Sequence, residues 1–129
     1  MPKITDVMVC VTNQRSCERL IQRGMELKTD GVELHVVHCV QTGQNFMGTP
    51  FEADAIEYLF TAAQVAGAEL TMLRADNVDD ALVEYAQANS VGMIVMGASP
   101  ERNRGSNSIM LRLQRRLPDV MFDIVKREE

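Results

Sequence analysis

The sequence predicts one α/β domain over residues 1–129, an open five-stranded parallel sheet with helices on both faces. A chain of 129 residues has the size of a single domain. Apolar residues make up 46% of it and charged residues 24%, which suits a core with a solvated surface and excludes a disordered chain. Short apolar runs alternate with amphipathic stretches along the chain. Strands that alternate with helices of about 10–15 residues favour a parallel sheet with right-handed connections.

Five short apolar runs are predicted strands, because continuous valine-rich runs are typical of strands buried on both faces. They span residues 6–12, 32–40, 69–74, 91–96 and 121–125. Apolar residues at helical spacing predict four amphipathic helices between them. These span 16–29, 53–66, 78–89 and a last segment from a cap at Ser106 or Ser108 to Leu117. The second helix is expected to bury Ile56, Leu59, Phe60, Ala63 and Ala66.

Several classes of protein are excluded by composition. No run approaches the roughly 18 apolar residues of a membrane helix, and the first ten residues lack the order of a secretory signal. Three cysteines without a CxxC pair give neither a disulfide framework nor a zinc spacing. The net charge of −5 disfavours general nucleic-acid binding. We therefore expect a cytoplasmic protein with no membrane or nucleic-acid partner.

The charge is unevenly distributed along the chain. Residues 101–116 contain five arginines and one acidic residue, a net charge of +4, which leaves −9 on the remainder. A local basic patch on an acidic body suits a small anionic ligand better than a polyanion, which would feel the whole field. The alternative is the solvated face of a helix.

The predicted ligand site lies where the strands end. In open parallel sheets, ligands bind at the carboxyl ends of the strands, where the strand order reverses. Thr12 and Asn13 follow the first strand, Cys39 and Val40 end the second, and the polar segment 97–107 follows the fourth. The basic segment overlaps this edge, so topology, charge and loop chemistry agree.

The segment after the fourth strand has the residues of a phosphate-binding loop. Free backbone N–H groups at a helix start bind phosphate, and arginine guanidinium groups add charge-assisted hydrogen bonds. The predicted ligand contacts here are Gly97, Ser99, Arg102, Arg104, Ser106 and Asn107. Neither G-x-x-x-x-G-K-[ST] nor G-x-G-x-x-G is present, and an ordinary surface loop is the alternative. Thr12 and Asn13 similarly either contact ribose or phosphate, or cap the first helix.

Histidines and cysteines are predicted to be structural. His35 and His38 are three residues apart on one strand, so they point to opposite faces and cannot share a metal ion. Cys10 and Cys39 lie on strands that are expected to be neighbours, and Cys17 lies on the apolar stripe of the first helix. Free cysteines usually behave as small buried hydrophobes.

No catalytic or metal-binding set is recognisable in the sequence. G-x-S-x-G and HExxH are absent, and no serine has an identifiable histidine partner. Asp76, Asp79 and Asp80 suit the positive end of the third helix, and Asp79 and Asp80 are expected to face water there with Glu84. The sequence therefore favours binding without catalysis.

Four stretches in order resemble the universal stress protein family: VMVCVTNQRSCERLIQRG, LHVVHCV, DDALVEYAQANSVGMIVMGAS and PDVMFDIV. Within it, the chain most resembles the stress-protein domain of the potassium-sensing Kdp histidine kinases. That resemblance rests on the cysteine-containing first strand, the S-x-E-R-L-I-x-x-G helix, and the G-x-S followed by an arginine-bearing loop. It implies strand order 3-2-1-4-5, an adenine-nucleotide α-hydrolase-like fold and a homodimer. We expect the dimer to form through the last strand, whose outer edge would otherwise be exposed for pairing.

The resemblance also implies a nucleotide-binding sensor in stress response. Backbone groups at Cys39 and Val40 would then pair with adenine. The family's ATP-binding pattern, G-x-x-G, nine residues, G-[ST], is matched only at Gly97, since Pro100 and Met110 occupy the other glycine positions. The implied ligand is AMP, ATP or cyclic di-AMP, and the implied partner is a signalling protein. The alternative is a ligand-free dimeric stress protein that acts through protein contacts, and an enzyme of the wider α-hydrolase group ranks last.

Overall fold

A computed structural model of the chain describes residues 6–11, 14–28, 31–43, 51–97 and 109–125. Its strands are β1 (Asp6–Cys10), β2 (Leu34–Gln41), β3 (Glu69–Ala75), β4 (Val91–Gly97) and β5 (Met121–Val125). Its helices are α1 (Gln14–Leu27), α2 (Glu52–Val65), α3 (Val78–Ala88) and α4 (Ile109–Arg116). The predicted alternation of strands and helices is confirmed. Helix α1 begins two residues earlier than predicted, and the predicted cap of α4 at Ser106 or Ser108 lies outside the described residues.

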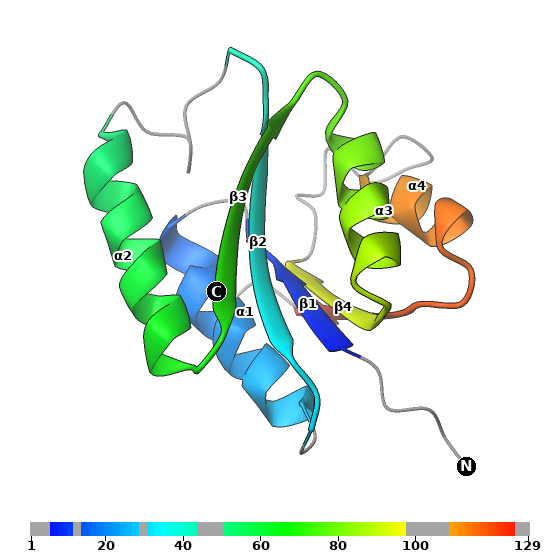
Figure 1. Cartoon of the computed structure of the whole chain (residues 1–129), viewed down its shortest axis with the longest axis horizontal. Helices are drawn as coiled ribbons and strands as arrows, with labels where there is room; N and C mark the ends of the chain where they lie inside the picture. Colours follow the sequence, from blue (N-terminus) through cyan, green and yellow to red (C-terminus); the bar gives the residue numbers. More distant parts are fainter. Residues whose placement is uncertain (1–5, 12–13, 29–30, 44–50, 98–108, 126–129) are drawn as a thin grey trace.

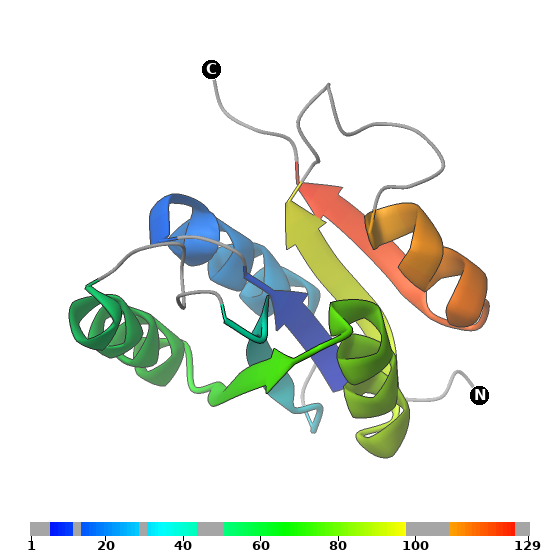
Figure 2. The same ribbon diagram turned by 90° about the horizontal axis from the view of Figure 1, so that it is seen from above.

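The five strands form one parallel sheet in the order β3-β2-β1-β4-β5, which confirms the expected order. Strand β1 is central, and Val9 lies opposite both Val36 on β2 and Val95 on β4. Helices α1 and α2 cover one face, and α3 and α4 cover the other (Figures 1 and 2). The chain crosses from β3 back over the sheet to β4, so the strand order reverses between β1 and β4.

The core consists of two apolar layers, one on each face of the sheet. Met8 and Val9 are both 0% exposed, and they point to opposite layers. Helix α1 lies close to the sheet at Gly24, where a Cβ atom would be 2.5 Å from Val9 Cγ2 and 3.0 Å from Leu34 Cδ1. A glycine is therefore required at this position by the close packing of α1, not by its backbone angles.

The predicted buried stripe of α2 is partly wrong. Phe60 is 53% exposed, and the buried residues are Ala55, Leu59 and Ala63. Large apolar side chains occur on more than one side of α2, so periodicity alone does not identify the face that contacts the sheet. The face with small residues lies against the sheet, and Phe60 is left on the surface.

A chain of hydrogen bonds crosses the amino-terminal edge of the sheet. His35, which is 4% exposed, lies between Asp6 and Tyr85. Its Nε2 is 2.9 Å from Asp6 Oδ2, and its Nδ1 is 3.0 Å from the Tyr85 hydroxyl. The same hydroxyl is 3.2 Å from Thr71 Oγ1, and Asp6 Oδ1 accepts a hydrogen bond from the Glu33 amide. These contacts join β1, β2, β3 and α3, and they confirm a structural role for His35.

No described helix combines the length and the apolar character that a membrane-spanning helix requires. Within the same residues, no group of three or more histidine, cysteine or carboxylate side chains is arranged to hold a metal ion.

Candidate functional site

The candidate site lies at the carboxyl ends of the strands, the edge toward which β2 and β3 run upward in Figure 1. Since Val9 pairs with Val95, the two strands on either side of the reversal in strand order end together, with Val11 near Gly97. Cys39 and Val40 lie on the next strand along this edge. The other predicted contacts, Thr12, Asn13, Ser99, Arg102, Arg104, Ser106 and Asn107, lie outside the described residues.

The backbone of Cys39 faces away from β3. Alternate residues of a parallel strand direct their N–H and C=O groups to the same neighbouring strand. The Glu33 and Val37 carbonyls accept hydrogen bonds from the β1 side, through the amides of Val7 and Val11. Cys39 is an even number of residues from Glu33 and Val37, so its main-chain groups face the same way, but the pairing of β1 with β2 ends at Val37. The main-chain donor and acceptor of Cys39 therefore face the β1 side of β2 at this edge, like those of Val37.

Val40 has the opposite backbone orientation. Thr42, which has the same parity, donates its amide hydrogen to the Ala75 carbonyl, 3.0 Å away. Val40 lies opposite Arg74 on β3, so its main-chain groups belong to the β2–β3 ladder. Of the two predicted adenine contacts, Cys39 has the backbone groups that face the site.

His38, the residue before Cys39 on β2, joins the ends of β1 and β2. Its side chain is 1% exposed, and Nδ1 donates a hydrogen bond to the Val11 carbonyl, 2.7 Å away. Burial lowers the pKa of His38, and the hydrogen bond to Val11 partly opposes that change. The imidazole is therefore neutral at pH 7 and fixes where β1 ends. Sequence reasoning missed this contact because Val11 makes it through a main-chain oxygen.

Gly97 ends β4 and is exposed. Among the described residues, a Cβ atom here would meet the Leu20 side chain, 3.9 and 4.0 Å away, which is ordinary contact. Packing among the described residues therefore does not require glycine at this position. Its lack of a side chain leaves the main chain at the end of β4 accessible.

The cysteines near this edge are protonated thiols. Burial raises the pKa of Cys10 to about 12, with a smaller contribution from Cys39, and burial also raises the pKa of Cys39. A thiolate is the reactive form of cysteine, so neither side chain is a nucleophile at neutral pH. Both cysteines belong to the same apolar layer, which agrees with the predicted structural role.

The basic segment predicted to bind an anion is partly neutralised by α3. Arg112 Nε and Nη2 both donate to the carboxylate of Asp79, and Arg116 Nη1 lies 2.5 Å from Asp80 Oδ1. The Asp79 side chain is only 15% exposed. The prediction that Asp79 faces water is therefore wrong, whereas the Asp80 side chain is 53% exposed as expected. Summed sequence charge cannot distinguish a free basic patch from a pair of helices joined by ion pairs.

The start of α1 supplies a positive dipole at the same edge. Helix α1 begins at Gln14, shortly after β1 ends. Unpaired N–H groups and the helix dipole favour an anion at such a position. Together with the Cys39 backbone and the open main chain at Gly97, this edge can bind a flat heterocycle through hydrogen bonds and an anionic group beside it.

Comparison with known proteins agrees with this architecture. Hypothetical protein MJ0577 has a TM-score of 0.68 and 13% identity, over 98% of this chain and 99% of that chain. The universal stress protein from Archaeoglobus fulgidus in complex with dAMP has a TM-score of 0.55 and 22% identity, over 98% and 100%. A universal stress protein family protein from Arabidopsis thaliana with AMP bound has a TM-score of 0.59 and 12% identity, over 96% and 92%. These likenesses show a shared fold.

A search among curated proteins finds no match. A family model matches residues 3–111, which is most of the chain, and its description is the universal stress protein family. This match includes the first four strands and the polar segments between them. The strand order, the helices on both faces and the family match agree, and the chain belongs to the universal stress protein family.

Proposed function

We propose that this protein is a regulatory domain that binds an adenine nucleotide at the carboxyl edge of its sheet without catalysis. The observation that carries the proposal is the Cys39 main chain, whose N–H and C=O face the β1 side of β2 where the β1–β2 pairing ends. An adjacent donor and acceptor match the hydrogen-bonding edge of adenine, which has its own acceptor beside the N6 amino donor. Complexes with dAMP and AMP in two structures of the same fold support this choice of base.

The remaining contacts follow from the sequence. Gly97 lets the ligand approach the main chain, and the residues proposed to hold phosphate are Ser99, Arg102, Arg104, Ser106 and Asn107. Thr12 and Asn13 contact ribose or phosphate after β1. Backbone N–H groups and arginines bind phosphate without activating a water molecule or a nucleophile. No catalytic base is proposed, and ligand binding is read out by a partner protein in the cytoplasm.

Cyclic di-AMP is included among the proposed ligands because of the resemblance to the stress-protein domain of Kdp histidine kinases. A cyclic dinucleotide presents an adenine edge to Cys39 and phosphates to Arg102 and Arg104. AMP and ATP offer the same base with a different number of charges. The experiment therefore compares AMP, ADP, ATP, cyclic di-AMP and cyclic di-GMP, with and without magnesium.

Thermal unfolding measures the binding directly. A ligand at about 100 times its Kd stabilises the folded state by about 2.7 kcal/mol, which is about 10 °C in Tm for a chain of this length. Gly97→Ala has room for its methyl group, so we expect an unchanged Tm without ligand and a smaller nucleotide shift. Arg102→Ala with Arg104→Ala is expected to abolish the shift, and Arg115→Ala on the exposed side of α4 is the matched control. No shift with any nucleotide at millimolar concentration would refute the proposal.

A ligand-free dimer is the second candidate function, and one observation favours it. Strand β5 is at the edge of the sheet, and Met121 at its start is 66% exposed. An unpaired edge strand is a template for pairing with another chain. Sedimentation of the wild-type protein and of Met121→Lys without nucleotide tests this alternative. A dimer that the substitution dissociates, together with no nucleotide shift, would favour function through protein contacts.

A further inference from the structure

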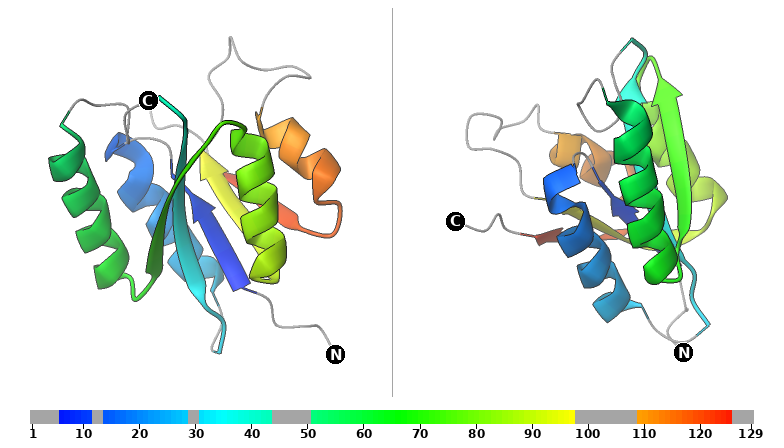
Figure 3. Two further views of the ribbon diagram at one scale, coloured as in Figure 1. Left: turned by 45° about the horizontal axis from the view of Figure 1, so that its top comes forward. Right: turned by 90° about the vertical axis from the view of Figure 1, so that its left-hand side faces the viewer.

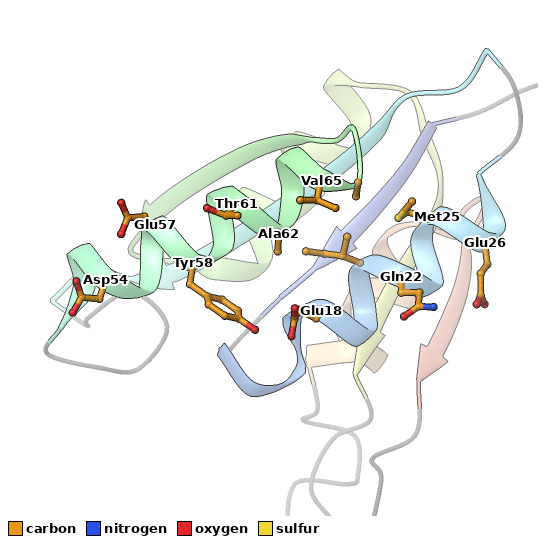
Figure 4. A pocket seen from close by; sticks show the side chains of 12 residues that line it. Glu18, Gln22, Met25, Glu26, Asp54, Glu57, Tyr58, Thr61, Ala62 and Val65 are labelled. Carbon is orange, nitrogen blue, oxygen red and sulfur yellow. The ribbon is translucent and has the colours of Figure 1, made fainter.

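A long groove lies between α1 and α2 on the side away from α3 and α4. The two helices lie side by side on one face of the sheet (Figure 3). The groove has a volume of about 880 Å³, and the described residues that line it come from these two helices and from the position after α2 (Figure 4). Ile21, Ala62 and Ala66 are among its apolar lining residues. It is separate from the carboxyl-edge site, and nothing proposed above uses it.

The walls of this groove expose large apolar side chains. Met25 on α1 is 46% exposed, and on α2 Tyr58 is 37% and Val65 82% exposed. These are three of the six large apolar side chains that the described part of the chain exposes. Scattered exposed apolar residues are ordinary, but contiguous ones along a concave surface mark an interaction site. Both helices have 14 residues, so each wall is about 21 Å long.

The rim of the groove is acidic on both sides. Glu18 and Glu26 lie on the α1 side, where Glu26 also pairs with Arg23 Nη1, 3.2 Å away, and Asp54 and Glu57 lie on the α2 side. The hydrogen bond from the Tyr58 hydroxyl to Glu18, together with burial, raises the pKa of Tyr58 to about 12. No lysine, arginine or histidine lines the groove among the described residues. Carboxylates at opposite sides of an apolar floor match a ligand with an apolar stripe and cationic flanks.

We propose that this groove binds an amphipathic helix of a partner protein, with an apolar face in the groove and lysine or arginine on both flanks. Helices that bind in grooves place apolar side chains at i, i+3 or i+4, and i+7 against the floor. About four turns of such a helix match the length of α1 and α2. Cationic side chains on its flanks lie near the rim carboxylates, which steer the encounter and fix its orientation.

Charge and packing favour another protein over a second copy of this chain as the occupant. Two copies that met groove to groove would bring their rim carboxylates together. Among the described helices the basic one is α4, and it is already committed, because Leu113 is 0% exposed and Arg112 and Arg116 pair with Asp79 and Asp80. We therefore assign the helix to another protein.

The test measures binding of a fluorescein-labelled leucine–lysine amphipathic peptide of 14 residues by fluorescence anisotropy. A leucine–glutamate peptide with the same apolar face tests the charge complementarity, and a scrambled leucine–lysine peptide tests the need for an apolar stripe. We expect binding of the first peptide only. Affinity should fall at least tenfold between 50 and 300 mM salt, because exposed charges are screened over a few ångströms at high ionic strength.

Variants separate this groove from nonspecific attraction to an acidic protein. Met25→Lys with Val65→Lys changes only exposed positions in the groove, so the fold is retained and binding should weaken at least tenfold. Glu57→Lys on α2 should weaken it about threefold, whereas Glu84→Lys on α3, an exposed glutamate on the other face of the sheet, should not. Retained far-UV circular dichroism and Tm confirm folding of each variant.

Several results would overturn the proposal. These are no binding of the leucine–lysine peptide, equal binding of the scrambled peptide, or equal loss of affinity in the Glu84→Lys control. Dimerisation that Met25→Lys with Val65→Lys abolishes would make a second copy the occupant. Binding of monomeric dodecyltrimethylammonium without the peptide would indicate a small amphiphilic cation. The nucleotide shift is measured on the same variants, so failure of either proposal is distinguishable from failure of the other.

Discussion

The hydroxyl of Tyr85 offers a sharp test of the polar chain at the amino-terminal edge. His35 Nε2 lies 2.9 Å from the Asp6 carboxylate, and Nδ1 lies 3.0 Å from the Tyr85 hydroxyl, which is also hydrogen-bonded to Thr71 Oγ1. Tyr85→Phe keeps the edge-to-face ring contact, whose centroids are 5.7 Å apart, and removes only the hydroxyl. Nδ1 of a histidine that is 4% exposed is then left without its partner.

Leaving a buried polar atom without its hydrogen-bond partner costs about 1–3 kcal/mol. The unfolding entropy is about 2.1 cal/mol/K per residue, and with 129 residues this gives about 0.27 kcal/mol/K for the domain. We therefore expect Tyr85→Phe to lower Tm by about 4–11 °C. Urea unfolding should show the same loss through a lower midpoint with an unchanged slope.

Tyr58→Phe is the matched control for this measurement. It removes the same hydroxyl from an exposed tyrosine on α2, whose partner is the exposed carboxylate of Glu18. Water replaces a hydrogen bond at the surface, so its free energy of unfolding should change by less than about 0.5 kcal/mol. A Tyr85→Phe loss as small as that of the control would refute the hydrogen bond between Tyr85 and His35.

Three further predictions follow from packing, charge and the buried thiols. Gly24→Ala should lower the free energy of unfolding by about 1–2 kcal/mol, because overpacking against Val9 exceeds the gain in helix propensity. Urea unfolding of this variant is compared with that of Gln22→Ala at an exposed position of the same helix. Equal effects of the two substitutions would contradict the close contact at Gly24. Arg112→Gln should lower the free energy of unfolding by about 1 kcal/mol, since its partner Asp79 is only 15% exposed. Arg115→Gln at an exposed position should lower it by less than about 0.5 kcal/mol. Equal losses in the two variants would indicate that Arg112 belongs to a free basic patch. Burial raises the pKa of Cys10 from 9.0 to about 12. The contribution of the protonated thiol to the free energy of unfolding is therefore complete below pH 9 and is lost as pH rises toward 12. Between pH 8 and 10, urea unfolding should show the free energy of unfolding falling by up to about 1.4 kcal/mol per pH unit. This fall should be smaller in Cys10→Ala. An unchanged slope in that variant would show that Cys10 ionises freely in the fold.

The order of strands and helices was predictable from the sequence because strands buried on both faces are continuous apolar runs, without alternating polar residues. Val9 and Val36 are continuous with apolar neighbours on their strands, and both are 0% exposed. Helix α2 was harder, since its buried alanines give a weak signal beside large apolar residues on its other sides. The stripe that includes Phe60 was therefore assigned to the core although Phe60 is on the surface.

Contacts between side chains distant in sequence were not predictable from it. His35 and Tyr85 are 50 residues apart, and their meeting depends on the register of β2 and on the packing of α3. The pairing of Arg112 with Asp79 depends on how α3 and α4 lie together. At the candidate site, strand order and residue type were enough to choose the edge. Which of Cys39 and Val40 presents its backbone required the hydrogen-bond pattern of the sheet.

The close contact at Gly24 determines which wall of the groove can adjust to an occupant. With Val9 Cγ2 only 2.5 Å from where a Cβ would lie, α1 packs directly against β1 at Gly24 and has no space there to move toward the sheet. Helix α2 lies on the sheet through Ala55, Leu59 and Ala63, two of which are small. Widening of the groove is therefore a displacement of α2 over β2 and β3. Changes in hydrogen exchange on peptide binding should accordingly concentrate in α2 and β3, while the amides of α1 and β1 keep their rates.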